Sequence, residues 1–260
     1  MHGRTIEYRV SESPQQLVEQ DKVFALFGTV GTEATLAIRA YVEQTGVPQL
    51  FVASGAAGLG RWSVGFSPSH ALEGAVLARQ VLRTSTQRRI AVLYEDDTDG
   101  RALLTAFRRG LGSRAGEITA TTNVGELPAG GAAAFVVLGR ASASAGLPAG
   151  AVSVTYLKDP RDPRWAGDPA LEKYRRTGGL KTTEYEAGMA AAFTLVDTLR
   201  RAGKAPARAR ILAAARSLNE ANNPFLVPGI VVKPPIRQVA LQRWSGGHWN
   251  VFTGPLAVAG

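Results

Sequence analysis

The chain reads VFALFGTVGT over residues 23–32 and GVPQLFVASGAAG over residues 46–58. In each stretch a short apolar run, typical of a buried parallel strand, ends in a loop of small residues. The residues between them, 33–44, place Ala34 and Ile38 on one face of a predicted helix. Strand, helix and strand in this order predict a parallel sheet with helical crossovers.

The same alternation continues along the chain, which therefore reads as two α/β units joined near residues 84–88. Ser69 and Asp99 are predicted helix N-caps, and Thr183 with Glu186 has the spacing of a capping box. Further strands are predicted at 4–10, 90–94, 118–124, 134–138 and 152–157. Further helices are predicted at 15–20, 69–83, 99–111, 183–201 and 207–218. The tail predicts strands at 230–233, 238–244 and 249–252, the last two joined in a C-terminal β-hairpin.

Composition excludes several classes of protein. The 260 residues include no cysteine, so neither a disulfide framework nor a thiolate metal site is expected. The 30 Lys+Arg outnumber the 21 Asp+Glu, but they are scattered as pairs rather than gathered in a stripe, and no nucleic-acid partner is predicted. The apolar runs are shorter than the roughly 20 residues of a membrane span. The first eight residues lack the apolar core of a signal peptide, so none is expected.

Two loops of small residues are the strongest candidates for a binding site. Gly31 and Thr32 precede a predicted helix start, where free backbone N–H groups favour an anion. The loop fits neither the P-loop nor the dinucleotide motif, which favours a small carboxylate over ATP or NAD. The second loop follows the neighbouring strand and offers small side chains and amides at Ala53, Ser54, Gly55 and Ala56. Two such loops at adjacent strand ends predict a ligand crevice; two tight turns are the alternative.

The acidic run 95–99 follows the predicted strand 90–94, at the end of the strand that usually faces a ligand. It lacks the spacing of an EF-hand loop. A direct ligand role for one of these acids, and a solvated loop with a cap at Asp99, both remain open. The three histidines, His2, His70 and His248, lie in unrelated places, so neither a metal site nor a catalytic triad is predicted.

A series of motifs follows one another along nearly the whole chain. They are GRTIEY (3–8), LVEQDKVFA (17–25), GTVGT (28–32), GVPQLF (46–51) with SGA (54–56), IAVLY (90–94), YLKDP (156–160), LVPGI (226–230) and the hairpin at 244–249. No single motif is diagnostic, but their order resembles that of the type I periplasmic binding proteins, in particular the leucine/isoleucine/valine-binding receptors of ABC transporters.

This resemblance implies an α/β fold of two Rossmann-like lobes with a ligand between them. Residues 1–83 with 180–225 would form the first lobe, and 84–179 with 226–260 the second. The first lobe would hold the ligand's carboxylate through Thr32, Ala53 and Ser54 or Gly55, next to Gly31 and Ala56. The second would contribute from Tyr94, Asp99, Gly139 and Arg140.

The function implied by the resemblance is solute binding for an ABC importer, without catalysis, cofactor or metal. The ligand would be an amino acid or an aromatic or aliphatic carboxylate, and the protein partner a permease. The family is exported, which implies a periplasmic or extracellular location, although the absence of a signal peptide leaves a cytoplasmic one open.

Four departures from the family pattern imply that both lobes are trimmed. The family has a strand and a helix ahead of the segment 3–8, a helix where this chain has residues 127–131, and a helix–strand unit after Gly139. It also has an aromatic residue at the position of Asp99. An acid there would repel a carboxylate and favour a cationic or polar ligand.

The missing first strand would leave a gap in the sheet, because it normally lies between its second and third strands. We therefore expect residues 4–10 to pair directly with residues 23–27, or a second chain to fill the gap as a homodimer. Two other functions remain open. One is a degenerate sensor or protein-interaction domain that has lost its ligand pocket, and the other is an enzyme that uses the acids of residues 95–99.

Overall fold

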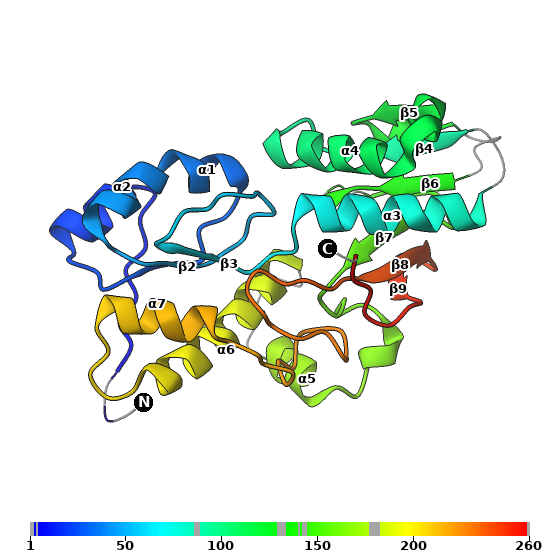
Figure 1. The fold of residues 1–260 in the computed structure, drawn as a ribbon. Helices are drawn as coiled ribbons and strands as arrows, with labels where there is room; N and C mark the ends of the chain where they lie inside the picture. The colour runs from blue at the N-terminus through cyan, green and yellow to red at the C-terminus, as the bar shows by residue number, and fades with distance from the viewer. Residues whose placement is uncertain are drawn as a thin grey trace. The chain divides into compact units, whose positions relative to one another are not determined.

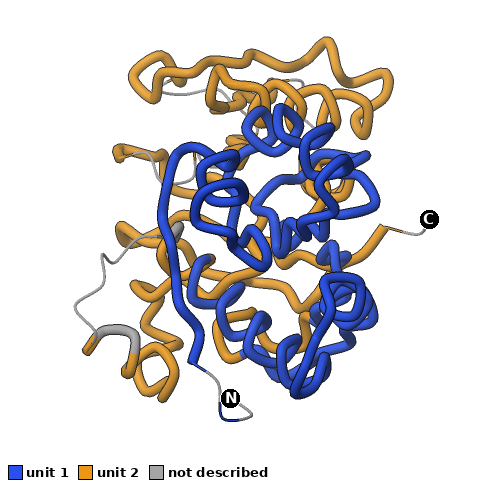
Figure 2. Tube along the Cα trace, turned by 90° about the vertical axis from the view of Figure 1, so that its left-hand side faces the viewer, with its two compact units in different colours: residues 1–67, 188–223, 231–237 blue, residues 68–187, 224–230, 238–260 orange. Residues whose placement is uncertain are grey.

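The computed structural model describes residues 3, 5–85, 89–128, 134–139, 141, 145–176 and 183–258. The chain forms two compact units (Figure 2). Unit 1 comprises residues 1–67, 188–223 and 231–237, and unit 2 comprises residues 68–187, 224–230 and 238–260. The sequence places the end of the first lobe at residue 83, near the end of helix α3 (His70–Thr84). In the structure the chain passes from unit 1 to unit 2 after residue 67, before this helix.

Unit 1 contains a parallel sheet of three strands in the order β1-β2-β3. These strands are β1 (Leu26–Phe27), β2 (Gln49–Val52) and β3 (Ser63–Gly65). The central strand β2 is fully buried, as its apolar run predicts. The predicted strand 23–27 forms only over its last two residues. Strand β3 was not predicted, because three residues without an apolar run carry no periodic signal.

The predicted helix at 33–44 is two short helices, α1 (Thr32–Ala37) and α2 (Arg39–Thr45), which meet at Ile38. Gly46 ends α2 in the left-handed conformation, with φ of 61°, and its N–H donates to the carbonyl of Val42 at 3.0 Å. Glycine is the usual residue at this position because it adopts the left-handed conformation without strain. Ile38 and Val42 pack with Leu26 and Val47 as the apolar core of this sheet.

The segment 5–10 does not form the expected strand. In the described part of the chain, β1 pairs only with β2, so the expected direct pairing of residues 4–10 with residues 23–27 is wrong. Arg208 occupies this region instead: its guanidinium donates to the carbonyls of Val23 at 3.1 Å and Phe24 at 3.0 Å. The alternating apolar residues of the segment remain exposed, because no neighbouring surface covers them.

The helices that complete the two units largely follow the predictions. Residues 188–202 of the long helix α6 (Thr183–Ala202) and α7 (Arg208–Arg216) belong to unit 1. Within the predicted helix 15–20 lies a single π-helical segment, η1 (Gln16–Gln20). Among the described residues, no helix is long and apolar enough to cross a membrane.

Unit 2 contains a six-stranded sheet in the order β5-β4-β6-β7-β8-β9, seen in Figure 1. The first four strands pair in parallel, and the last two form the predicted antiparallel hairpin, in which the rings of Trp244 and Trp249 pack edge to face. The strands are β4 (Ile90–Leu93), β5 (Ile118–Thr121), β6 (Ala134–Val137), β7 (Val152–Thr155), β8 (Ala240–Ser245) and β9 (His248–Val251).

Helices α3 and α4 (Thr98–Leu111) share an apolar core with one face of this sheet. The two helices approach closely because each has a glycine at their contact, Gly74 on α3 and Gly110 on α4. A Cβ atom on Gly74 would lie 2.6 Å from the backbone of Phe107, and one on Gly110 would lie 2.6 Å from Cβ of Ala78. These pairs advance along both helices in the same direction, so α3 and α4 run parallel, as Figure 1 shows.

Unit 2 is trimmed where the sequence indicates. The described residues between β5 and β6 contain only a one-turn 3-10 helix, η3 (Val124–Glu126), in place of a crossover helix. A longer 3-10 segment, η2 (Gly112–Glu117), follows α4. Two elements in the turn-rich stretch after β7 were not predicted, η5 (Pro163–Trp165) and α5 (Pro169–Arg176).

Candidate functional site

In unit 1 the loops after β1 and β2 bring two hydroxyl groups together. The Oγ1 of Thr32 and the Oγ of Ser54 are 2.6 Å apart, and both residues are buried. The Ser54 Oγ also accepts a hydrogen bond from the N–H of Ala56 at 3.1 Å. We call Gly31, Thr32 and residues 53–56 the hydroxyl edge; it contains the six positions that the sequence singled out in this unit.

Sheet pairing is what joins the two loops. Val30 and Ala53 form a parallel bridge that continues the β1–β2 ladder beyond the strands. The N–H of Gly31 donates to the Ala53 carbonyl at 3.0 Å, and the N–H of Ala53 donates to the Thr29 carbonyl at 2.8 Å. Gly31 has φ of 89°, a conformation that favours glycine. The chain can therefore turn into α1 directly after the last ladder bond.

The sequence-based reason for an anion site here needs correction. It assumed a continuous helix from residue 33 to 44, whereas α1 has only six residues and ends at Ala37. A helix this short contributes little macrodipole. The groups that this edge can offer a ligand are therefore hydroxyl groups and backbone amides, which bind a carboxylate or an amide by hydrogen bonds rather than by charge.

In unit 2 the predicted positions follow the ends of two paired strands. Leu93 of β4 lies opposite Val137 of β6, so Tyr94 and Gly139 leave the sheet at the same edge. Tyr94 is partly buried and packs against the core under α3. Gly139 has φ of 55°, and a Cβ there would lie 2.8 Å from Leu103. Arg140 lies outside the described residues.

Asp99 does not cap α4 as expected. The cap is Asp97, whose backbone is extended and whose Oδ1 accepts a hydrogen bond from the N–H of Gly100 at 2.7 Å. Asp99 lies within the first turn, and its Oδ1 is 2.9 Å from Nε2 of His70 at the start of α3. The cap sits two residues earlier because the helix begins at Thr98.

Two other acids of the run 95–99 also interact with nearby protein groups. Asp96 pairs with Arg101 at 2.6 Å, and Asp97 is the helix cap. In the portion of the chain that the structure describes, no three His, Cys, Asp or Glu side chains are grouped so as to hold a metal ion. These contacts give Asp96 and Asp97 local structural roles around the start of α4.

Sequence reasoning missed two residues beside Asp99. His70 was treated as an unrelated helix-start residue, and Glu73 was not considered. Glu73 lies one turn after His70 on α3, and burial, the largest influence, raises the pKa of its carboxyl to about 7. Positive His70 opposes this rise and negative Asp99 adds to it. We call His70, Glu73 and Asp99 the charge cluster; only the packing of α3 on α4 brings them together.

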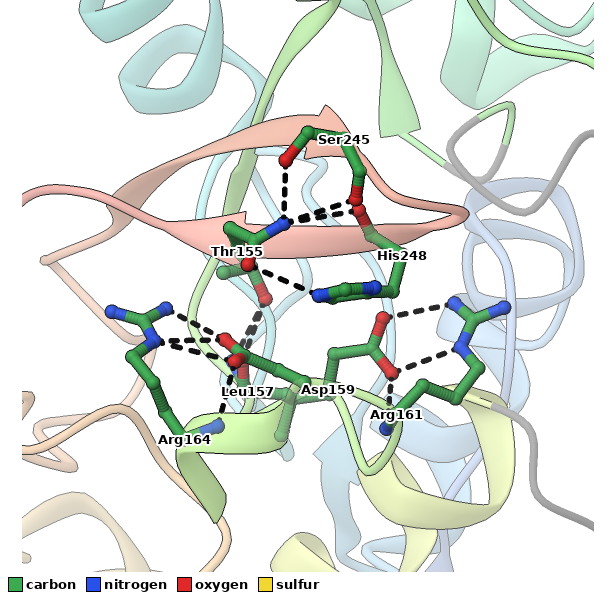
Figure 3. A network of polar contacts seen from close by, with 9 residues as sticks. Thr155, Leu157, Asp159, Arg161, Arg164, Ser245 and His248 are labelled. Carbon is green, nitrogen blue, oxygen red and sulfur yellow. Dashed lines mark hydrogen bonds and ion pairs between the residues drawn. The ribbon is translucent and has the colours of Figure 1, made fainter. Parts of the chain in front are cut away.

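A second polar group lies on the loop after β7 (Figure 3). Asp159 pairs with Arg161 at 2.9 Å and Asp162 with Arg164 at 2.6 Å. Near them the buried Lys158 contacts Asp168 at 2.6 Å. Burial raises the pKa of the Asp168 carboxyl, but hydrogen bonds, first from Lys158 and then from backbone amides, outweigh it and leave the pKa below its usual value. This network fixes the turn-rich stretch by ion pairs within it.

Glu186 was predicted to complete a capping box, and the structure shows otherwise. It is fully buried on α6, and neither carboxyl oxygen has a hydrogen-bond partner. Burial, reinforced by Asp159 and opposed by Lys158, raises its pKa to about 9. Glu186 is therefore an uncharged acid at neutral pH, enclosed next to the loop after β7.

Comparison with known families yields a match over about half of the chain. A family model described as periplasmic binding protein matches residues 9–146. No curated protein sequence gives a significant match. The two loops of the hydroxyl edge and the start of α4 lie within the matched range.

Solved structures resemble this chain over nearly its whole length. A branched-chain amino acid ABC transporter protein of Thermus thermophilus with bound valine is 15% identical, with a TM-score of 0.71, and the match covers 94% of this chain and 81% of that one. A solute-binding protein of Rhodopseudomonas palustris in complex with 3,4-dihydroxybenzoic acid is 16% identical, with a TM-score of 0.68, covering 94% and 80%. A substrate-binding periplasmic protein of Ralstonia solanacearum is 20% identical, with a TM-score of 0.67, covering 88% and 80%. These likenesses establish the type I two-lobe fold, in a shortened form.

Proposed function

Because the chain belongs to the periplasmic binding protein family, we propose that it is the solute receptor of an ABC importer and binds a small carboxylate-bearing solute. Members of the family bind solutes and are not enzymes. The observation that carries the proposal is the hydroxyl edge, where two hydroxyl groups and neighbouring amides converge at adjacent strand ends. This is the end of a parallel sheet at which ligands usually bind.

The hydroxyl edge is proposed to hold the ligand's carboxylate. The hydroxyls of Thr32 and Ser54 and the amides after Ala53 are neutral donors, which recognise carboxylate oxygens without requiring a buried cation. Two of the structural relatives hold valine and 3,4-dihydroxybenzoic acid. Both solutes carry a carboxylate, so a small carboxylate-bearing solute is the class we propose here.

Unit 2 is proposed to contribute from Tyr94, Asp99, Gly139 and Arg140. The sequence alone led to the expectation that Asp99 repels a carboxylate. In the structure His70 lies 2.9 Å from this carboxylate, so a protonated imidazole would offset its charge. A ligand with a carboxylate is then compatible with an acid at this position.

The proposed partner is an ABC permease pair, and the proposed location is the periplasm or the extracellular face of the membrane. Both follow from membership of the family, in which receptors deliver the solute to the transporter. Co-purification of the chain with membranes that contain the permease, dependent on ligand, is the measurement that checks this partner.

Isothermal titration calorimetry against a panel of amino acids and aromatic carboxylates tests the ligand class. We expect at least one solute to bind, and Ser54→Ala to weaken that binding by about tenfold, the cost of one lost hydrogen bond to a charged group. Ser217→Ala, an exposed serine of unit 1 that bonds only to its own helix, is the matched control and is expected to bind as the wild type does.

The alternative is a sensor or interaction domain without a transport ligand. It is favoured by the burial of Thr32 and Ser54, whose hydroxyls already bond to each other. A folded protein that binds no member of the panel would replace the receptor proposal with this alternative.

A further inference from the structure

The charge cluster occupies a defined place in unit 2, where two helices begin side by side. Helices α3 and α4 pack in parallel (Figure 1). His70 on the first turn of α3 contacts Asp99 on the first turn of α4. The helix α4 follows β4 directly, so both helix starts lie at the edge where the parallel strands end. This is the same edge that carries Tyr94 and Gly139.

One pair in the cluster is in close contact and largely buried. The Nε2 of His70 is 2.9 Å from the Oδ1 of Asp99, with side-chain exposures of 13% and 24%. Glu73 follows His70 by one helical turn and is partly buried, so its carboxyl interacts electrostatically with both His70 and Asp99. At such short range in a partly buried setting, a change in one charge alters the energy of the other two.

Among the residues that the structure describes, the elements packed against α3 bring few other charges towards the cluster. The strand β7 packs against α3 and contains no titratable residue. On the α4 side, Asp96 is paired with Arg101 on the exposed surface, and Asp97 caps the helix, with Glu95 preceding them. Burial keeps the pKa of Glu73 at about 7, far above its ordinary value of 4.5, so this carboxyl exchanges its proton near neutrality.

We propose that His70, Glu73 and Asp99 form a proton-responsive charge selector at the ligand edge of unit 2. While Glu73 holds its proton, its carboxyl adds no charge to the cluster. When Glu73 loses its proton, the cluster carries one additional negative charge. A monocarboxylate anion is then disfavoured, whereas an amino acid, which has no net charge, is affected less. This inference rests on the proposed solute-binding function and names the property by which that site discriminates among solutes.

Nuclear magnetic resonance tests the proton site without any ligand. In protein labelled at the side-chain carboxyl of glutamate, we expect the Glu73 carboxyl to titrate near pH 7. Glu73→Gln should remove this titration. A Glu73 carboxyl that titrates below pH 5.5 would overturn the proton site.

Calorimetry at pH 6 and pH 8 tests selection, with 4-hydroxybenzoate as the monocarboxylate and valine as the zwitterion. Between these pH values the wild type should lose about fivefold in affinity for 4-hydroxybenzoate relative to valine, and Glu73→Gln less than twofold. Glu117→Gln removes a carboxylate near the far end of α4, so it is the control for net charge and should retain the wild-type dependence.

The outcomes separate this inference from the proposed function. If both solutes bind but the pH dependence is unchanged in Glu73→Gln, the selector is overturned and solute binding stands. If neither solute binds and the wider panel also fails, the proposed function is overturned together with the selector, even where the proton site itself titrates as expected.

Discussion

Unit 1 and unit 2 present different chemistry where their parallel strands end. The hydroxyl edge of unit 1 offers hydroxyl groups and amides, and its two side-chain oxygens lie 2.6 Å apart. The charge cluster of unit 2 offers an imidazole and two carboxyls held by two parallel helices. The hydroxyl edge is therefore neutral at every pH near 7, whereas the charge cluster changes its charge near pH 7.

Under the proposed function, this difference gives the two edges separate tasks. Neutral donors recognise the shape and oxygen atoms of a carboxylate, and their strength does not depend on pH. Titratable groups respond to the net charge of a solute and to the proton concentration. Variants in the hydroxyl edge should therefore change affinity or stability equally at all pH values, whereas variants in the charge cluster should change the pH profile.

The largest effect is expected from Gly100→Ala in unit 2. A Cβ at this position would lie 2.0 Å from the carbonyl oxygen of Glu95, so either α4 or the loop before it must move. We expect a loss of about 4 kcal/mol in the free energy of unfolding, measured by urea denaturation. Gly116→Ala, where a Cβ meets nothing within 4 Å, is the control; similar losses for both variants would contradict this reading.

The next largest effect concerns Glu186. Its folded pKa of about 9 lies above its ordinary value of 4.5, so its protonated form is favoured by folding. The stability that it contributes is complete below pH 4.5 and is lost as the pH rises towards 9. Glu186→Gln, which cannot ionise, should therefore gain about 3 kcal/mol over the wild type at pH 7 and almost nothing at pH 4.5. Parallel denaturation profiles for the two proteins from pH 4.5 to 8 would disprove the assignment.

A smaller effect, and one without pH dependence, is expected in the hydroxyl edge. Thr32→Val keeps the shape of the side chain but removes its bond to Ser54. The loss of one buried hydrogen bond should lower the free energy of unfolding by about 1.5 kcal/mol, equally at pH 6 and pH 8. A loss that differs between these pH values would break the contrast between the two edges.

The smallest effect tests the correction at the start of α4. Asp97→Ala removes the helix cap and should cost about 1 kcal/mol, whereas Asp99→Asn keeps the cap and should cost about 0.5 kcal/mol through the pair with His70. Thermal unfolding followed by circular dichroism measures both. The reverse ranking would restore Asp99 as the cap.

Local signals predicted most of the fold. The alternation of apolar runs and helical faces is confirmed in α3, β4, α4 and the terminal hairpin, and Ser69 caps α3 as expected, with its Oγ accepting from the Leu72 amide at 3.2 Å. Each of these features depends on residues close together in the chain. Their physics is therefore visible in a short window of sequence.

The features that sequence reasoning missed depend on partners far along the chain. Residues 4–10 alternate like a strand, but strand formation needs a neighbouring edge, and Arg208 takes two of the carbonyls near β1. Glu186 has the spacing of a capping box, yet tertiary packing buries it. The charge cluster combines residues from two helices, so the residue pattern of either helix alone does not predict it.

The way the chain is divided between the units has a consequence for biosynthesis. Unit 1 contains residues 1–67 but also residues 231–237, and unit 2 contains residues 68–187 but also residues 238–260. A ribosome that has produced residues 1–67 has therefore made all three strands of the unit 1 sheet without the later segments that complete the unit. Domains usually fold as units, the earlier one first, during synthesis. Here both units need residues beyond 230, so neither is complete until these have been made, and the nascent chain must remain unaggregated until then.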